Sequence, residues 1–440
     1  MLEGLVERCE HAPVHVPFGT VLDVVGLIVE IGGLRAAVGE TLSVHSAPGS
    51  RLDVEVVGFR NGRLLATPLG ALSGVRPGAH VERTHRGPTI AVSDALLGRV
   101  LDSFGRPLDG GPPPLARRAV PVNALPPPPF QRRPIDRQLA TGVRVLDALI
   151  PLGLGQRLGI FAGAGVGKST LLGMVCRLSQ ADVNVVGLVG ERGRELNDFI
   201  RNSLGAEGLA KSVVVTATSD QPPLVRARGA EAATAIAEHF RDQGKSVLLV
   251  MDSVTRYAMA LREAALAAGE PPATKGYPPS VFAALPRLLE RAGTGAGQGV
   301  ITALYTVFVE GDDLSDPVAD AVRGILDGHI VLSRDLAEAG QFPAVDVLKS
   351  VSRLAPEIMQ PPDLAAASVV RGHLAAYAEA KDLIQLGAYV NGSDPRVEAA
   401  RAALPEILPF LKQRLDEHTG AAEALTRLRT LSRPRGKPAR

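Results

Sequence analysis

Through residues 136–356, short apolar runs alternate with amphipathic stretches. This alternation is typical of a mainly parallel β-sheet that is covered by helices on both faces. The runs with the pattern of buried strands are residues 158–162, 183–189, 212–217, 246–251, 299–309 and 329–332.

The flanking parts of the chain show two other patterns. Residues 14–90 consist of short β-rich runs broken by glycine, such as TVLDVVGLIVEIGG, which indicates a small all-β barrel or sandwich. Residues 357–431 are rich in alanine and leucine without a strand pattern, which favours a helical domain. We therefore predict a multidomain α/β protein with an N-terminal β domain, a central α/β domain and a C-terminal helical domain.

Three further segments connect or extend these domains. Residues 91–135 contain DGGPPPLARRAVPVNALPPPPFQRRP, whose prolines favour extended backbone, so we predict a linker, with a proline-motif ligand as the alternative. Residues 432–440 are basic and broken by proline, which favours a disordered, solvated end over a site for an anionic partner. Residues 1–13 form a short arm that packs on its own domain or binds a partner, because four apolar side chains share one helical face: Leu2, Leu5, Val6 and Cys9.

Composition narrows the class of protein. The chain of 440 residues is 45% hydrophobic and 21% charged, as in ordinary globular proteins of more than one domain. Its net charge of +2 provides no strong field for nucleic acid or anionic lipid. The two cysteines, Cys9 and Cys176, give no disulfide framework, which suits a reducing cytosol. We expect neither a signal peptide nor a membrane-spanning helix.

A glycine-rich loop follows the first predicted central strand, in AGAGVGKSTLLGMV. Small residues allow successive backbone N–H groups to surround a phosphate, Lys168 would neutralise it, and the Ser169 hydroxyl would bind Mg²⁺. The usual first glycine of this pattern is replaced by Ala162. We predict a nucleotide-binding loop made of Gly163, Ala164, Gly165, Val166, Gly167, Lys168, Ser169 and Thr170.

Two carboxylates lie at the ends of other predicted strands. Asp252 ends SVLLVMD, where it would hold Mg²⁺ beside the phosphate loop or cap the next helix. Glu191 follows VNVVGLVG, where it would orient the water that attacks the γ-phosphate or simply start a solvated helix.

Several long segments together resemble the flagellum-specific export ATPase, a relative of the rotary ATP synthase catalytic subunit and of injectisome type III secretion ATPases. The resemblance covers about Val14 to Pro395, and its main segments are GIFAGAGVGKSTLLGM, VVGLVGERGRELNDF, VLLVMDSVTRYAMA, GEPPATKGYPPSVFAALPRLLERAG, EGDDLSDPVAD and ILDGHIVLSRDLAEAGQFPAVDVLKSVSR. It implies an N-terminal β-barrel, a central RecA-like P-loop domain and a C-terminal helical domain.

The resemblance also implies roles for single residues. Glu191 would polarise the attacking water, with Arg192 beside the active site. Phe342 would stack on adenine, and Arg353 would reach the nucleotide of a neighbouring subunit as an arginine finger. ATP and Mg²⁺ are the cofactors that follow.

The same resemblance implies partners and a location. We expect a homo-oligomer, most plausibly a hexamer, in contact with a stator-like regulatory subunit, a central stalk protein, export-gate proteins and chaperone-bound export substrates, without nucleic acid. The protein would be cytoplasmic and peripheral at the inner face of the cytoplasmic membrane through its partners. The segments GYPPSVF and LGAYVNGSDP favour the flagellar system over the injectisome, while a ring nucleic-acid translocase and a rotary synthase subunit are weaker alternatives.

Overall fold

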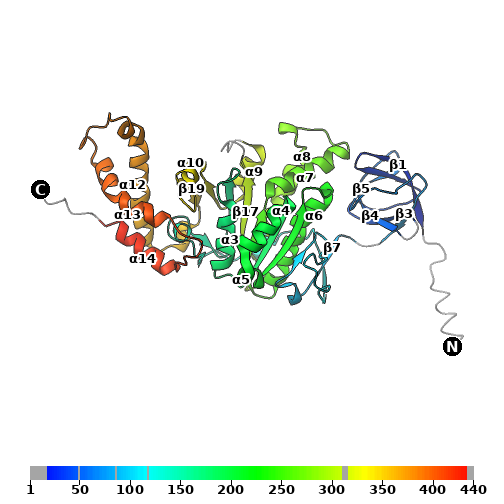
Figure 1. Ribbon diagram of the computed structural model, residues 1–440. Helices are drawn as coiled ribbons and strands as arrows, with labels where there is room; N and C mark the ends of the chain where they lie inside the picture. The colour runs from blue at the N-terminus through cyan, green and yellow to red at the C-terminus, as the bar shows by residue number, and fades with distance from the viewer. Residues whose placement is uncertain (1–16, 48–49, 85–86, 116–117, 310–315, 434–440) are drawn as a thin grey trace. The chain divides into compact units, whose positions relative to one another are not determined.

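The computed structural model of the protein describes residues 17–47, 50–84, 87–115, 118–309 and 316–433 (Figure 1). They divide into two compact units: one contains the N-terminal strands with residues 220–225 and 260–278, and the other contains the remainder. The predicted arm with Leu2, Leu5, Val6 and Cys9, and the tail beyond residue 433, lie outside the described residues.

The first unit contains a closed barrel of six strands in the order β1-β2-β5-β4-β3-β6, so the N-terminal β domain is a barrel and not a sandwich. A tight hairpin joins β4 to β5 through Asn61 and Gly62, whose φ angles of 51° and 76° are those of a type I′ turn. Valine and isoleucine side chains such as Val29, Ile31 and Val54 fill the interior at 0% exposure. The strands are β1 Phe18–Val25, β2 Ile28–Gly32, β3 Thr41–Ala47, β4 Ser50–Arg60, β5 Arg63–Pro68 and β6 His80–Arg83.

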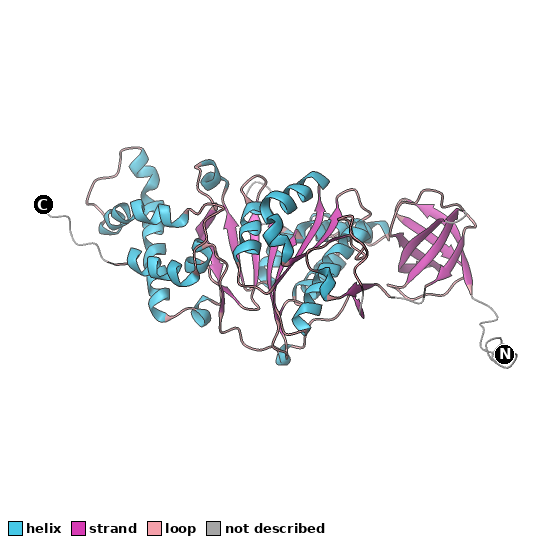
Figure 2. Ribbon diagram, turned by 60° about the horizontal axis from the view of Figure 1, so that its bottom comes forward, coloured by secondary structure: helices cyan, strands magenta, loops and turns pink. Residues whose placement is uncertain are grey.

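The second unit is organised around a nine-stranded sheet in the order β19-β18-β12-β17-β15-β13-β14-β8, with β16 paired to β17 (Figure 2). Neighbouring strands from β18 to β8 run parallel along this order, while β19 is antiparallel to β18. The strands are β8 Val100–Leu101, β12 Arg157–Ala162, β13 Val183–Glu191, β14 Ser212–Thr218, β15 Ser246–Asp252, β16 Gly293–Thr294, β17 Val300–Phe308, β18 Gly328–Leu332 and β19 Val345–Ser352.

The burial of the strands explains why apolar runs in the sequence predicted this sheet. In β13 and in β15 every residue but one is buried, as expected for strands covered on both faces. The mainly parallel central sheet is therefore confirmed. The pattern did not predict β8 or β19; β8 lies within residues 91–135, which the sequence assigned to a linker, and residues 118–121 there form β9, paired with β7 Thr89–Val92.

Helices connect and cover the strands of the sheet (Figure 1). Their ends follow local chemistry: the Asp316 side chain, for example, accepts hydrogen bonds from the backbone N–H groups of Val318 and Ala319 at the start of α9. The helices are α2 Arg144–Leu149, α3 Lys168–Leu178, α4 Gly193–Asp198, the π-helical η3 Phe199–Leu204, α5 Gly205–Ala210, α6 Pro223–Asp242, α7 Val254–Ala267, α8 Pro279–Leu289, α9 Pro317–Ile325 and α10 Arg334–Glu338.

The C-terminal part is helical, as predicted, and consists of α11 Ala355–Ile358, α12 Pro361–Gln385, α13 Pro395–Leu411 and α14 Ala421–Leu431. Val370, Ile407 and Leu428 are fully buried and belong to the same hydrophobic core as the strands of the sheet. Among the described residues, none of the helices combines the length and the apolar character that crossing a membrane requires.

Arg144 ties these helices to the central part of the unit. Its side chain is 2% exposed, and its Nε donates to the Phe410 carbonyl at 2.8 Å. Its other guanidinium nitrogens donate to the Lys412 carbonyl and to the Glu417 carboxylate. The backbone N–H of Arg144 also donates to Gln413 Oε1 at 2.7 Å. One buried cation therefore satisfies the polar groups where α13 ends.

Arg144→Ala is expected to lower the free energy of unfolding by about 3 kcal/mol or more, because it leaves a carboxylate and buried carbonyl groups without their donor. Urea denaturation measures this change. Arg396→Ala is the matched control, since the Arg396 side chain is 71% exposed in its pair with Asp394. Equal, small effects of the two substitutions would show that Arg144 is not a structural link.

Candidate active site

The glycine-rich loop joins β12 to α3, as the sequence predicts. Gly165 and Gly167 have φ angles of 78° and 87°, a left-handed backbone that residues with a Cβ rarely adopt. The helix then begins at Lys168, so its first N–H groups and its positive dipole end face the loop. Val166 is buried at 2% exposure and anchors the loop. This backbone is suited to holding phosphate groups.

A cavity of 510 Å³ lies over the loop. It is lined by seven of the eight predicted loop residues, all but Val166, and by the two strand-end carboxylates, Glu191 and Asp252. Arg192 also lines it, with a side chain that is 80% exposed and lies 3.8 Å from Glu195. The fold thus brings together the residues that were predicted from three separate segments.

Asp252 and Lys168 form the central ion pair of this cavity. Lys168 Nζ lies 2.5 Å from Asp252 Oδ1, and the Thr306 hydroxyl donates to the same oxygen at 2.7 Å. Asp252 is 3% exposed, so its negative charge is balanced almost entirely by these protein groups. Asp252 was expected either to hold Mg²⁺ beside the loop or to cap the next helix. Its contacts place its carboxylate in the cavity next to the loop.

Glu191 lies near the same lysine, with Oε1 4.0 Å from Lys168 Nζ. Burial, followed by the charge of the neighbouring Asp252 carboxylate, raises the pKa of Glu191 to about 7, although Lys168 opposes the shift. A carboxylate with a pKa near neutrality is able both to accept and to hold a proton at physiological pH. This is the chemistry that activation of a water molecule requires.

Sequence reasoning missed several groups in this cavity. Arg256 lines it, and a Cβ at Gly190 would lie 2.9 Å from the Cβ of Arg256, so the two backbones pack closely. Phe308, Glu195 and Asp198 line it as well. Arg256 stands four residues after Asp252, in the first turn of α7, which was the only signal for it in the sequence.

A second cavity, of 660 Å³, adjoins the loop from the side of the C-terminal helices. Phe342 lies there with 46% of its surface exposed, and a Cβ at Gly167 would lie 3.5 Å from its ring. Residues 412–417 also line this cavity, and the backbone N–H of Gln413 donates to the Phe342 carbonyl at 2.9 Å. An exposed aromatic ring beside a phosphate loop offers a stacking surface for a planar base.

Arg353 is placed differently. Among the described residues that line the two cavities it is absent, and its guanidinium donates to the carbonyls of Leu326 at 3.1 Å and Arg323 at 3.4 Å. It follows β19 on the surface of the unit. The structure therefore does not bring Arg353 to the phosphate loop of its own chain.

The strand-loop-helix with Lys168, the carboxylates at neighbouring strand ends and the parallel sheet define a P-loop nucleoside triphosphatase. Residues 142–352 match the ATP synthase alpha/beta family, nucleotide-binding domain, and residues 359–430 match the T3SS EscN ATPase C-terminal domain. The chain belongs to the ATP synthase alpha/beta family. The family and the ATPase class that the sequence predicted are confirmed.

Individual relatives agree with this placement. The chain is 48% identical to a flagellum-specific ATP synthase of Bacillus subtilis over 432 residues, which cover 98% of each chain. It also resembles the solved structure of the assembled ATPase EscN from the type III secretion system of enteropathogenic E. coli, with a TM-score of 0.89, 42% identity and coverage of 94% of this chain and 100% of that chain. EscN in complex with its central stalk EscO matches with a TM-score of 0.87, 41% identity and the same coverage.

The raised pKa of Glu191 predicts a pH-dependent effect of Glu191→Gln on stability. Below the ordinary carboxyl pKa of 4.5 both the folded and the unfolded states hold the proton. Between 4.5 and about 7 the folded state holds more protons, so this group's contribution is progressively lost as the pH rises. The variant lacks this loss and should gain stability relative to the wild type as the pH rises to about 7.

Urea denaturation without nucleotide, repeated across this pH range, measures the difference between the two proteins. Glu207→Gln is the matched control, because it removes the same kind of carboxyl group at an exposed position on α5, outside the cavity. A pH-independent difference for Glu191→Gln would contradict a proton held on Glu191 at neutral pH.

Proposed function

We propose that the protein hydrolyses ATP to energise protein export through the flagellar type III secretion apparatus. The observation that carries the proposal is the convergence of Lys168, Glu191 and Asp252 on one cavity, in a chain that resembles flagellum-specific ATP synthases along almost its full length. Hydrolysis would release chaperone-bound substrates and promote their unfolding before export.

In the proposed reaction each side chain has one task. Lys168 leaves Asp252 to neutralise charge on the phosphates, and the N–H groups of residues 163–170 hold the phosphate oxygens. Glu191, ionised in part near neutral pH, accepts a proton from the attacking water. Arg192, at the rim of the cavity, adds positive charge beside the site.

The donor groups in the cavity suit Mg²⁺, which prefers oxygen ligands. The Ser169 hydroxyl and the buried Asp252 carboxylate would hold it. When bound, the ion supplies charge neutralisation at the phosphate oxygens. Asp252 then needs no cation from Lys168, which is free to contact the phosphates.

We further propose that the chain acts as a hexameric ring. Phe342 would stack on the adenine of its own subunit, since its ring lies beside the loop, whereas Arg353 would complete the site of a neighbour. The assembled state and the central stalk named for EscN support an oligomer with a stalk protein here. A stator-like subunit and export-gate proteins would hold the ring at the inner face of the cytoplasmic membrane.

The injectisome is the second candidate system, because the solved EscN structures belong to a type III secretion system of that kind. Cells that make this protein, with Glu191→Gln introduced at its own gene, separate the two. Loss of swimming and of secreted hook and filament proteins is the expected result. Unchanged motility together with loss of needle-type secretion would assign the protein to the injectisome instead.

Lys168→Ala is expected to abolish ATP hydrolysis, because nothing else on the loop supplies a cation to the phosphates. Glu191→Gln should bind ATP with nearly unchanged affinity and lose turnover by about 10²-fold to 10⁴-fold, the usual contribution of a general base. Phosphate release and binding of a fluorescent ATP analogue measure the two steps. Lys349→Ala, at an exposed lysine, is the control that should retain full activity.

Arg353→Ala should reduce ring-dependent hydrolysis by about 10³-fold or more while leaving the fold intact. In rings mixed with Glu191→Gln subunits, some interfaces pair an intact Glu191 with an intact Arg353, so activity should partly return. Mixing Arg427→Ala with Glu191→Gln provides the control for dilution alone, since Arg427 is exposed on α14. Mixed rings without any recovery would exclude action of Arg353 in trans.

A further inference from the structure

Two histidines and a glutamate gather on one face of the barrel. His45 lies on β3, and His80 and Glu82 lie on β6, which pairs with β3 in antiparallel register through Val44 and Val81. Both valines are 0% exposed and point into the barrel, so their neighbours His45, His80 and Glu82 point outward. The next step of the register sets His45 opposite His80, with Glu82 two residues further on the same face.

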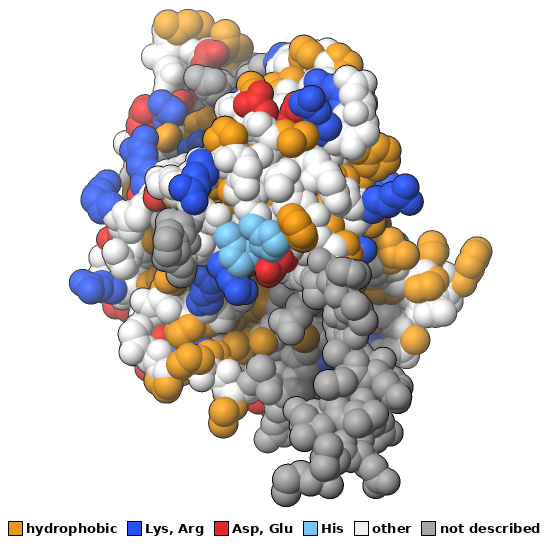
Figure 3. Space-filling model, turned by 90° about the vertical axis from the view of Figure 1, so that its right-hand side faces the viewer, with side chains coloured by type: hydrophobic (Ala, Val, Ile, Leu, Met, Phe, Trp, Pro, Cys, Tyr) orange, Lys and Arg blue, Asp and Glu red, His pale blue; other side chains and the backbone are white. Residues whose placement is uncertain are grey.

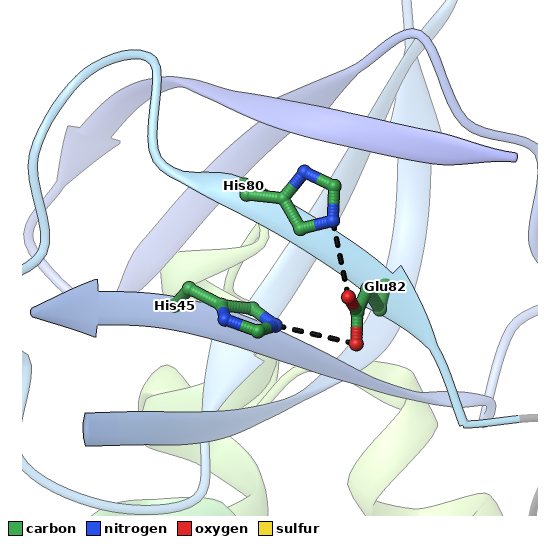
Figure 4. A group of neighbouring side chains, drawn as sticks. All are labelled: His45, His80 and Glu82. Carbon is green, nitrogen blue, oxygen red and sulfur yellow. Dashed lines mark hydrogen bonds and ion pairs between the residues drawn. The ribbon is translucent and has the colours of Figure 1, made fainter. Parts of the chain in front are cut away.

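The three side chains converge through their polar atoms (Figure 4). Nε2 of His80 lies 3.1 Å from Glu82 Oε1, and Nε2 of His45 lies 3.2 Å from Glu82 Oε2. One ligand atom from each residue lies within 4.8 Å of the other two. Ligand atoms around a tetrahedral ion with bonds of about 2.0–2.1 Å are about 3.3 Å apart, so small rotations would close this group around a metal.

The surroundings keep the Glu82 carboxylate ionised and partly enclose the cluster. Nε2 of His45 is shielded from solvent and has no hydrogen-bond partner among the described residues. Its contact with Glu82 is the 3.2 Å approach of an ion pair. The His45 imidazole, followed by that of His80, lowers the pKa of Glu82 below its ordinary value of 4.5 and keeps it ionised. The ring of Phe18 lies 4.7 Å from that of His80 and covers one side. On the barrel face seen in Figure 3, histidine side chains form a patch beside an acidic one.

We propose that His45, His80 and Glu82 bind a divalent late transition metal ion, with Zn²⁺ as the physiological candidate. Two imidazoles and one carboxylate form a ligand set that zinc accepts, and imidazole nitrogen disfavours Mg²⁺ and Ca²⁺. Three protein ligands leave the fourth position to water. Without the metal, both imidazoles contact Glu82 directly, and the ion would take the place of these two contacts.

Binding has two physical consequences. The ion would link β3 to β6, next to the seam where β6 pairs with β1, and would stabilise the barrel because it binds only the folded state. It would also displace the protons that the imidazole nitrogens now direct at Glu82, so zinc binding should release protons to the solvent. All three ligands belong to the barrel, so binding does not require a nucleotide.

The test titrates the full-length protein with Zn²⁺ against a chromogenic chelator, and with Co²⁺ for its visible absorption, in excess Mg²⁺ to occupy sites made of oxygen ligands. We expect one Zn²⁺ per chain, an intense tetrahedral Co²⁺ spectrum and a higher melting temperature with Zn²⁺. His45→Ala/His80→Ala should weaken the affinity more than about 100-fold. Glu82→Gln, nearly isosteric, should weaken it as well and guards against a double variant that does not fold.

The matched control is His11→Ala/His15→Ala, which removes two imidazoles from the same end of the chain. It should leave the affinity, the stoichiometry and the Co²⁺ spectrum unchanged. The proposal is overturned if the wild type binds no Zn²⁺ in excess Mg²⁺, if the control loses binding equally, or if Glu82→Gln folds and binds as the wild type does.

Discussion

The ion pair between Lys168 and Asp252 is the interaction on which the site depends. Asp252 ends a strand that is buried on both faces, so its charge is tolerated only because Lys168 and Thr306 surround it. Glu191 lies close to the same lysine, and two adjacent carboxylates share one cation at high cost. Burial of Glu191, followed by the charge of Asp252, raises the pKa of Glu191 to about 7, so Glu191 holds a proton part of the time near neutral pH. The site therefore contains a carboxyl group, that of Glu191, whose pKa would fall if a further cation entered the cavity.

The parallel sheet explains why this much of the site was visible in the sequence. The carboxyl ends of β12, β13 and β15 meet at one edge, so a loop or carboxylate that follows an apolar strand falls into the same place. Lys168, Glu191 and Asp252 were predictable for this reason. Residues 412–417 were not, because they approach the loop only through tertiary packing of the C-terminal helices. Edge strand β8 has two residues, too few to give a periodic pattern.

The cluster of His45, His80 and Glu82 on the barrel was also not predictable from the sequence. His45 and His80 are separated by 35 positions, and no local spacing relates them. Their proximity depends on the pairing of β3 with β6 in a closed barrel, whose order departs from the order of the strands in the chain. The periodicity of apolar residues predicted that the N-terminal domain is all-β. It did not predict the register between β3 and β6, which brings the three side chains of the cluster together.

The region around Arg144 connects the nucleotide site to the C-terminal helices. Arg144 donates to the Lys412 carbonyl and to the Glu417 carboxylate, and residues 412–417 line the cavity that contains Phe342. A base stacked on Phe342 would therefore lie beside residues 412–417, which are hydrogen-bonded to the buried guanidinium of Arg144. Beyond Phe342 the chain continues through β19 to Arg353, so one strand separates the residue proposed for the chain's own nucleotide from the residue proposed for its neighbour's. β19 pairs with β18 in antiparallel register, so both proposed contacts belong to one strand of the sheet and to the segments that flank it.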